Sequence, residues 1–261
     1  MLAKIARNAA RLYLLFAFTG RGKRCCICGR RSAHFAGFGT PVRPSARCPR
    51  CNSLERHRFL WEYLCSAHGL PSLPAGARLL HFAPEPFMSR LLVDVPGISY
   101  TTVDLDPGSA QVAADITALP FEDGVFDVFV CSHVLEHVPD DRKAMRELFR
   151  TMAHDGWGLV MVPLRDGGTV EDSTVVDPTE RAQLFGQADH VRWYGDDLVQ
   201  RLDEAGFDVE VIYPANILPE EGLAERGIPP DERMFRVRRR AAPATARGGY
   251  SGGASGEEPT R

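Results

Sequence analysis

The sequence predicts an α/β protein, with a mostly parallel sheet flanked by helices and a small cysteine-rich module in front of it. From Arg78 onward, short apolar runs alternate with amphipathic stretches, which is the rhythm of strand–helix–strand units. Two pairs of cysteines precede that point. At 261 residues, the chain is long enough for one well-filled domain and a small appendage.

The expected strands are the short apolar runs at 78–82, 99–104, 125–132, 157–163, 207–213 and 233–239. Three helices are expected at 53–65, 139–152 and 196–205. Ser53 should cap the first helix, Gly156 should stop the second and Gly206 should end the third.

Five segments follow from this pattern: a basic N-terminal helix (1–24), a cysteine module (25–52), a linking helix and connector (53–76), an α/β domain (77–240) and a tail (241–261). The tail is rich in Gly, Ala, Ser and Pro, so we expect it to be disordered.

Charge is distributed unevenly along the chain. Residues 1–54 carry eleven Lys or Arg and no acidic residue, whereas the remainder carries 20 basic and 34 acidic side chains, a net charge of −14. The front end therefore suits an anionic contact: nucleic acid, a lipid surface, a phosphorylated substrate or the protein's own acidic domain.

The first 24 residues combine basic side chains with an apolar run at 12–18. This run is far shorter than the roughly 20 residues that a membrane-spanning helix needs. Two readings stay open, a basic helix on a membrane face and a helix docked on its own domain. No small-residue cleavage site follows the run, so we expect a cytoplasmic protein with reduced thiols.

Cys25, Cys28, Cys48 and Cys51 form two Cys-x2-Cys knuckles separated by 19 residues. Four thiolates in this spacing predict one tetrahedral zinc ion, with no position left for water and hence a structural role. Disulfides or free thiols are the alternatives.

Other residues bear on the cysteine count. Gly29 and Asn52 follow the knuckles and accept the positive φ that a tight metal loop requires. Cys26, His34 and His57 are substitute ligands. Cys65 and Cys131 lie on apolar faces, where we expect them to be core residues.

The stretch from Asp115 to Pro163, which includes FDVFVCSHVLEHV, resembles the class I S-adenosylmethionine-dependent methyltransferases, particularly their small-molecule, type 11-like branch. The resemblance extends over about residues 78–213. It implies a Rossmann-like seven-stranded sheet whose last strand is antiparallel. It also implies that S-adenosylmethionine lies across the carboxyl ends of the first strands.

The resemblance also implies roles for individual residues. Asp104 corresponds to the acid that binds the ribose, and Asp115 and Ile116 to the side chains that meet adenine. Ser132 and His133 would lie beside the reactive methyl group.

The sequence departs from the family at its glycine-rich loop, which here reads His-Phe-Ala-Pro-Glu-Pro. Ala83 is small enough for the cofactor to approach, and Glu85 stands where glycine is usual. A carboxylate there suits the methionyl ammonium group. The alternative is a site that no longer binds the cofactor.

His133 is the first candidate for a general base, with His137 and Glu136 behind it. In one alternative, these three residues and His190 bind a second metal ion. In another, Glu136 and His137 cap the following helix. We expect three residues of the long polar segment 165–195 to line the acceptor pocket: His190, Arg192 and Tyr194.

The leading prediction is a methyltransferase acting on a small-molecule or sugar-type acceptor. An RNA methyltransferase that holds RNA on its basic zinc module is the first alternative. A non-catalytic, zinc-bearing interaction protein on a degenerate methyltransferase fold is the second.

Overall fold

The computed structural model describes residues 18–39 and 41–240. Most of the expected N-terminal helix and the whole expected tail lie outside these residues. Lys23 and Arg24, expected at the end of that helix, form a short strand instead. Among the described residues, no helix combines the length and the apolarity that crossing a bilayer requires.

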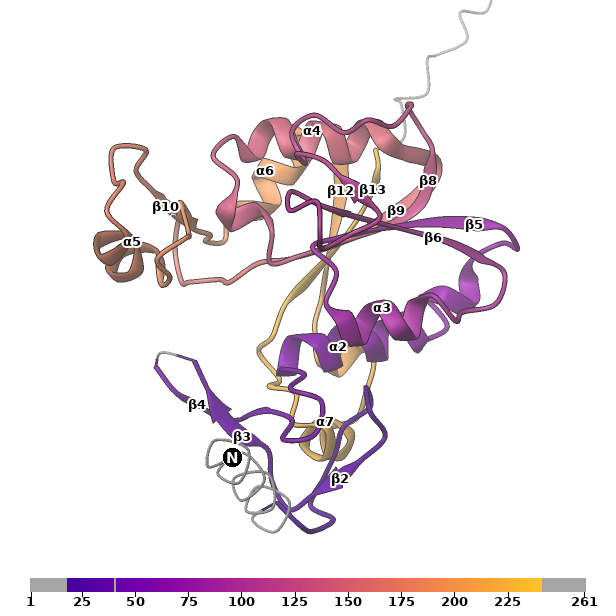
Figure 1. The fold of residues 1–261 in the computed structure, drawn as a ribbon, viewed down its shortest axis with the longest axis vertical. Coiled ribbons are helices and arrows are strands. Elements are labelled where there is room, and N and C mark those ends of the chain that lie inside the picture. Colours follow the sequence, from indigo (N-terminus) through magenta and orange to yellow (C-terminus); the bar gives the residue numbers. More distant parts are fainter. Residues whose placement is uncertain (1–17, 40, 241–261) are drawn as a thin grey trace, which may run out of the picture.

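A seven-stranded sheet in the order β12-β13-β9-β8-β5-β6-β7 forms the centre of the molecule (Figure 1). Its strands are β5 (Ala77–Phe82), β6 (Ile98–Asp104), β7 (Val112–Ala113), β8 (Phe126–Ser132), β9 (Met152–Met161), β12 (Phe207–Ile212) and β13 (Met234–Arg239). Strands β5 to β9 pair in parallel, and β13 is antiparallel to both of its neighbours. The predicted fold class, with its antiparallel last strand, is therefore confirmed.

Helices cover both faces of the sheet (Figure 1). Helices α4 (Asp141–Thr151) and α6 (Leu198–Glu204) lie on one face, and α2 (Glu55–Cys65) and α3 (Pro86–Leu92) on the other. Helices α5 (Pro178–Phe185) and α7 (Glu220–Arg226) lie away from the sheet, α7 beside the cysteine module. Short 3-10 turns are η1 (Leu70–Ser72), η2 (Leu135–His137) and η3 (Pro214–Asn216).

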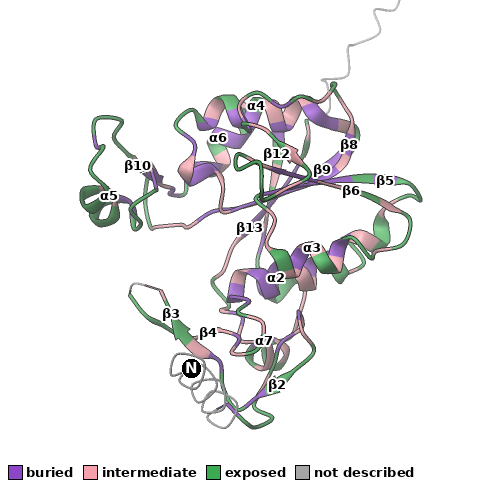
Figure 2. Cartoon of the chain, in the orientation of Figure 1, coloured by how far each residue is buried: buried purple, intermediate pink, exposed green. Residues whose placement is uncertain are grey.

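Alternation along the strands produces two apolar cores. Leu80 of β5 packs with α4 and α6 on one face, and its neighbour Leu79 packs with α2 and α3 on the other. Successive strand residues point to opposite faces, so one strand can serve both cores. Figure 2 shows the resulting buried strands between half-exposed helices.

Three local predictions were wrong. Ser53 does not cap α2, because the helix begins after Leu54, whose backbone N–H donates to His57 Nδ1 at 3.1 Å. Gly156 does not stop α4, which ends at Thr151, and lies instead within β9. Cys65 is exposed, whereas Cys131 is buried as expected.

The cysteine module consists of two small antiparallel hairpins. Strands β1 (Lys23–Arg24) and β2 (Arg31–Ser32) form one hairpin, and β3 (Ala36–Phe38) and β4 (Arg43–Arg47) form the other. In Figure 1 the module lies beside α7, at the end of the molecule away from α4 and α6.

Arg58 of α2 fastens the module to the rest of the chain. Its side chain is fully buried, and its guanidinium donates to the carbonyls of Ser53 and Ala46 at 2.9 and 3.0 Å. It also donates to the carbonyls of Arg226 and Gly227, at the end of α7, at 2.6 and 2.8 Å. One arginine therefore satisfies backbone acceptors of both the module and the α/β domain.

Candidate functional site

The loops that follow the parallel strands meet at one edge of the sheet, because the carboxyl ends of parallel strands point the same way. Ala83 is the first residue after β5, and its N–H donates to the carbonyl of Val103 in β6 at 2.8 Å. Its φ of 45° lies in the left-handed region that favours glycine. This position is exposed, so its backbone is open to a bound molecule.

Glu85 lies between two histidines. Its Oε1 is 3.1 Å from His57 Nε2 of α2, and its Oε2 is 3.6 Å from His81 Nε2 of β5. Burial alone would raise the pKa of Glu85, but its contact with His57 and the charges of both histidines lower that pKa to about 2. Glu85 is therefore a carboxylate at neutral pH. Burial lowers the pKa of His81 to about 4, so that imidazole is neutral at pH 7.

Asp104 and Asp115 lie at the same edge. Asp104 ends β6 opposite Ala113 of β7, and Asp115 follows two residues later. Each carboxylate accepts a backbone N–H at 2.8 Å, from Asp106 and Thr117 respectively. Ile116 is 7% exposed and belongs to the core beside them. The structure thus brings the three residues together on neighbouring strand ends.

Ser132 ends β8, and His133 follows it with a φ of 57°. The His133 N–H donates to the carbonyl of Met161 at 2.8 Å, which fixes this left-handed turn. His133 Nδ1 lies 3.1 Å from Oε1 of the buried Glu136. Burial lowers the pKa of His133 well below its usual range, and burial raises that of Glu136 to about 7.

Three segments of the chain bring charged or imidazole side chains toward His133. Its imidazole lies within electrostatic reach of Arg56 and His57 in α2, of Glu85 after β5, and of His190. Several buried polar atoms there have no hydrogen-bond partner among the described residues: Arg56 Nε, His81 Nε2, Glu85 Oε2, Ser132 Oγ, His133 Nε2, Glu136 Oε2 and His190 Nε2. Buried polar atoms are normally satisfied, so this concentration indicates a ligand site.

The contributions of α2 were missed by the sequence analysis, which treated His57 only as a substitute zinc ligand and did not consider Arg56. A signal existed in the run Glu-Arg-His-Arg at the start of that helix, because consecutive charged and imidazole side chains cannot all face water on a helix with an apolar face.

His137 belongs to a different group. Its Nδ1 lies 3.3 Å from the Asp189 carbonyl, and its ring meets the His190 ring edge-on at 4.8 Å. One ligand atom each of Glu136, His137 and His190 lies within 4.8 Å of the others. The structure therefore unites three of the four residues considered for a second metal ion.

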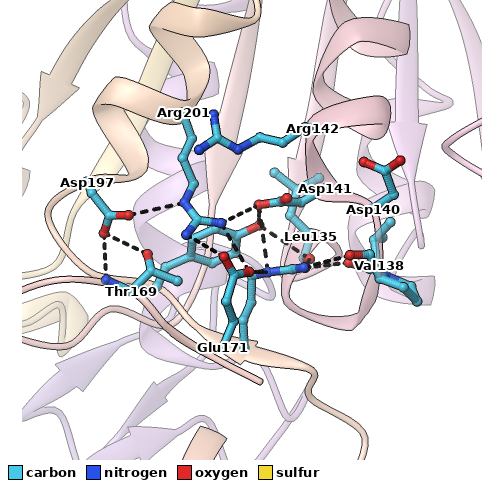
Figure 3. Close-up of polar contacts among 12 residues, drawn as sticks. Leu135, Val138, Asp140, Asp141, Arg142, Thr169, Glu171, Asp197 and Arg201 are labelled. Carbon is cyan, nitrogen blue, oxygen red and sulfur yellow. Dashed lines mark hydrogen bonds and ion pairs between the residues drawn. The ribbon is translucent and has the colours of Figure 1, made fainter. Parts of the chain in front are cut away.

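Arg192 and Tyr194 were expected to line an acceptor pocket and do not. Both are at most 3% exposed, and they contact the buried Asp141, which pairs with Arg201, while Arg192 also reaches the exposed Glu171. Figure 3 shows Asp141, Glu171 and Arg201 of this network. The Arg192 guanidinium donates to the Leu135 carbonyl at 3.0 Å and to Glu171 at 2.9 Å. The network joins the two ends of the long segment 165–195, which contains β10 (Val170–Glu171) and β11 (Arg192–Trp193).

The sulfur atoms of Cys25, Cys28, Cys48 and Cys51 form a second candidate site. All four lie within 4.8 Å of one another, and all four cysteines are free. Two tight turns shape this cluster, in which Gly29 N–H donates to the Cys25 carbonyl and Asn52 N–H to the Cys48 carbonyl, at 2.8 and 3.0 Å.

Other side chains near the four sulfurs do not take the place of a cysteine. Gly29 and Asn52 have φ of 68° and 62°, as the knuckle spacing predicted. Cys26 points instead at the Arg58 carbonyl, and His57 at Glu85, so neither replaces a cysteine in the cluster. Ser53 Oγ lies 3.2 Å from the sulfurs of Cys25 and Cys51.

The sheet order, with one antiparallel strand next to the edge, defines a Rossmann-like methyltransferase fold. The solved structure of SpnF, described as a [4+2]-cyclase, has a TM-score of 0.50 at 17% identity, covering 72% of this chain and 82% of SpnF. At this identity the likeness concerns the fold alone.

Residues 87–160 match the family model of a methyltransferase domain, so the chain carries such a domain. Two curated relatives, both described as an uncharacterized methyltransferase, come from Mycobacterium sp. strains KMS and MCS. Each is 31% identical over 98 residues, which cover 33% of this chain and 39% of the relative. The chain therefore spans about two fifths of the length of these relatives.

Proposed function

We propose that this protein transfers a methyl group from S-adenosylmethionine to a hydroxyl or amine of a small-molecule or sugar-type acceptor. The observation that carries the proposal is the set of unpartnered buried polar atoms around His133, at the carboxyl edge of a methyltransferase sheet. Bound donor and acceptor would give these atoms the hydrogen bonds that they lack.

The residues at this edge fit the donor. The backbone at Ala83 is open to close approach, and the Glu85 carboxylate offers Oε2 to the methionyl ammonium group. We assign the ribose diol to Asp104 and the adenine ring to Asp115 and Ile116. The donor supplies an electrophilic methyl group on a positively charged sulfur. The acceptor would attack the methyl carbon in line with the carbon–sulfur bond, and the sulfur would leave with the electrons of that bond.

His133 is our candidate for the general base. Its Nδ1 faces Glu136 at 3.1 Å, which favours the tautomer with the proton on Nδ1 and leaves the Nε2 lone pair free. Its lowered pKa keeps the imidazole neutral at pH 7. His133 Nε2 would therefore take the proton that the acceptor loses as its bond to the methyl group forms.

The four-cysteine cluster would hold zinc in a closed shell of sulfur ligands, which supports a structural role. It would keep α2 in place, and α2 carries Arg56 and His57 into the site. Two of the module's arginines pair with acidic residues of the protein itself: Arg31 with Glu225 at 2.8 Å, and Arg43 with Glu55. These pairs favour the protein's own acidic surface, rather than RNA, as the contact of the basic module.

Calorimetric titration with S-adenosylmethionine tests donor binding, with Asp104→Asn as the variant in which binding should weaken about tenfold or more. Absence of heat from the wild type would support the non-catalytic alternative. Incubation with labelled donor and cell extract, divided into metabolite, glycan, RNA and protein fractions, then tests the acceptor. Label in the RNA fraction would support the RNA alternative.

The variant His133→Asn tests the base. Asparagine tolerates a positive φ better than histidine does and retains a polar atom near Glu136, but it has no Nε2. We expect turnover to fall by about 10²–10⁴-fold with unchanged donor affinity. Unchanged turnover would exclude His133 as the base.

A further inference from the structure

We propose that Glu136, His137 and His190 form a second metal site, which binds one divalent transition-metal ion through a carboxylate oxygen and two imidazole nitrogens. One ligand atom from each residue lies within 4.8 Å of the others. This site is separate from the four cysteines, and its occupancy does not depend on the proposed methyl transfer.

Both imidazoles are held in the orientation that a metal ligand needs. His190 Nδ1 lies 2.9 Å from the Phe185 carbonyl, so Nδ1–H donates there and Nε2 keeps its lone pair. His137 Nδ1 is likewise engaged by Asp189, 3.3 Å from its carbonyl and 3.4 Å from its carboxylate. Such an outer hydrogen bond from the other ring nitrogen is typical of metal-bound histidine.

Two of the three ligand residues are buried and each has a polar atom without a partner among the described residues, while the third, His137, has a side chain that is 36% exposed. Glu136 is 1% exposed and His190 is 2% exposed, and neither Glu136 Oε2 nor His190 Nε2 makes a hydrogen bond within the described chain, whereas Glu136 Oε1 lies 3.1 Å from His133 Nδ1. Leaving a buried acceptor unsatisfied costs about 1–3 kcal/mol, and more when it is charged. A bound cation would satisfy Glu136 Oε2 and His190 Nε2 at once.

The chain fixes the site before any ion binds. The residue after His190 donates its N–H to the Glu136 carbonyl at 2.9 Å, and the next residue, Arg192, donates to the carbonyls of Leu135 and Val138. The segment that carries His190 is thus fastened on both sides of Glu136 and His137. Figure 3 shows Leu135 and Val138 beside the network of Asp141, Glu171 and Arg201.

A capping role does not account for this geometry. Helix α4 is capped by Asp140, whose side chain accepts the Lys143 N–H at 2.9 Å. Glu136 and His137 precede that cap in η2 and make no side-chain hydrogen bond to α4 in the described chain.

Two imidazoles and one carboxylate are the donor set of many zinc and iron(II) sites. Three protein ligands leave at least one coordination position for water or an acceptor oxygen. Because Oε1 of Glu136 lies 3.1 Å from His133 Nδ1, an ion on Oε2 would lie next to the proposed base. Such an ion could bind an acceptor hydroxyl and lower its pKa.

The test is metal content after equilibration of the full chain with Zn²⁺ buffered at a micromolar free concentration, followed by desalting. We expect two zinc ions per wild-type chain and one per His190→Asn chain. Asparagine retains a donor for the Phe185 carbonyl and removes the Nε2 ligand. His154→Asn is the matched control, because His154 is 91% exposed, and it should retain two ions.

Substitution with Co²⁺ tells the two sites apart. The sulfur-to-cobalt charge-transfer band of the cysteine site should have equal intensity in the wild type and in His190→Asn, which also verifies that the variant is folded. Only the weaker ligand-field absorption of the second site should disappear. One ion per wild-type chain, or two ions in His190→Asn, would overturn the proposal.

Discussion

His57 Nε2 lies 3.1 Å from Glu85 Oε1, so the helix that follows the cysteine module touches the loop proposed to bind the methyl donor. The same histidine accepts the Leu54 N–H, and Ser53, one residue earlier, contacts the sulfurs of Cys25 and Cys51. Five consecutive residues therefore span the distance from the cysteine cluster to the candidate active site. The module's structure and donor binding should be coupled.

Cys48→Ser should show this coupling. The loss of one of four thiolates should abolish tight zinc binding by the module, destabilise the protein by at least about 4 kcal/mol and weaken S-adenosylmethionine binding. Denaturant unfolding and calorimetry measure the two effects. Cys65→Ser is the control, since Cys65 is exposed and outside the cluster, and it should change stability by no more than about 0.5 kcal/mol. Donor affinity unchanged in Cys48→Ser would mean that the module and the site are independent.

Ala83 should tolerate glycine but not valine. Its φ of 45° costs a β-branched residue more than alanine, and added methyl groups would occupy the exposed surface proposed for the donor. We expect Ala83→Val to lose about 1–2 kcal/mol of stability and at least tenfold in donor affinity. Ala83→Gly should remain within about 1 kcal/mol of the wild type with its affinity retained. Equal donor affinities for the two variants would place the donor elsewhere.

The sequence predicted the sheet well because its central strands, such as β5 and β8, are buried on both faces and read as apolar runs. It missed β7, since two residues produce no periodic signal. The start of β9 was also missed, because residues 152–156 contain His154, Asp155 and Gly156 and do not resemble a buried strand.

The cysteine cluster could be predicted because its ligands are close in sequence and their spacing is specific. The role of α2 could not, because His57 and Glu85 meet only through the packing of α2 and α3 on one sheet face. Arg192 and Tyr194 were misassigned for a related reason: a polar loop looks functional in sequence, whereas here its polar groups satisfy one another inside the protein.

Because of Glu85, the free energy of unfolding should depend on pH in the acidic range. The pKa of Glu85 is about 2 in the folded protein, below its ordinary value of 4.5, so the unfolded chain binds more protons between these values. The stability that the Glu85 carboxylate contributes to the folded protein is therefore present above about pH 4.5 and is lost as the pH falls toward 2.

Glu85→Gln has no carboxyl group to titrate, so we expect the stability difference between wild type and variant to shrink by about 1–3 kcal/mol as the pH falls from neutral toward 3. Denaturant unfolding at a series of pH values measures this difference. A difference that stays constant across the series would show that the pKa of Glu85 is not lowered.

Arg192→Lys should destabilise the protein although it preserves the charge. Arg192 is 3% exposed, and its guanidinium donates to three backbone carbonyls of the segment 135–139 as well as to Glu171. A lysine ammonium cannot reproduce this planar set of donors, so some of these buried backbone carbonyls would lose their hydrogen-bond donors. We expect a loss of about 2–4 kcal/mol in the free energy of unfolding, measured with urea. Arg142→Lys is the matched control, because its pair with Glu204 has side chains 37% and 47% exposed and should contribute less than about 1 kcal/mol. If both substitutions had the same small effect, the buried network would not be what holds His190 against Glu136.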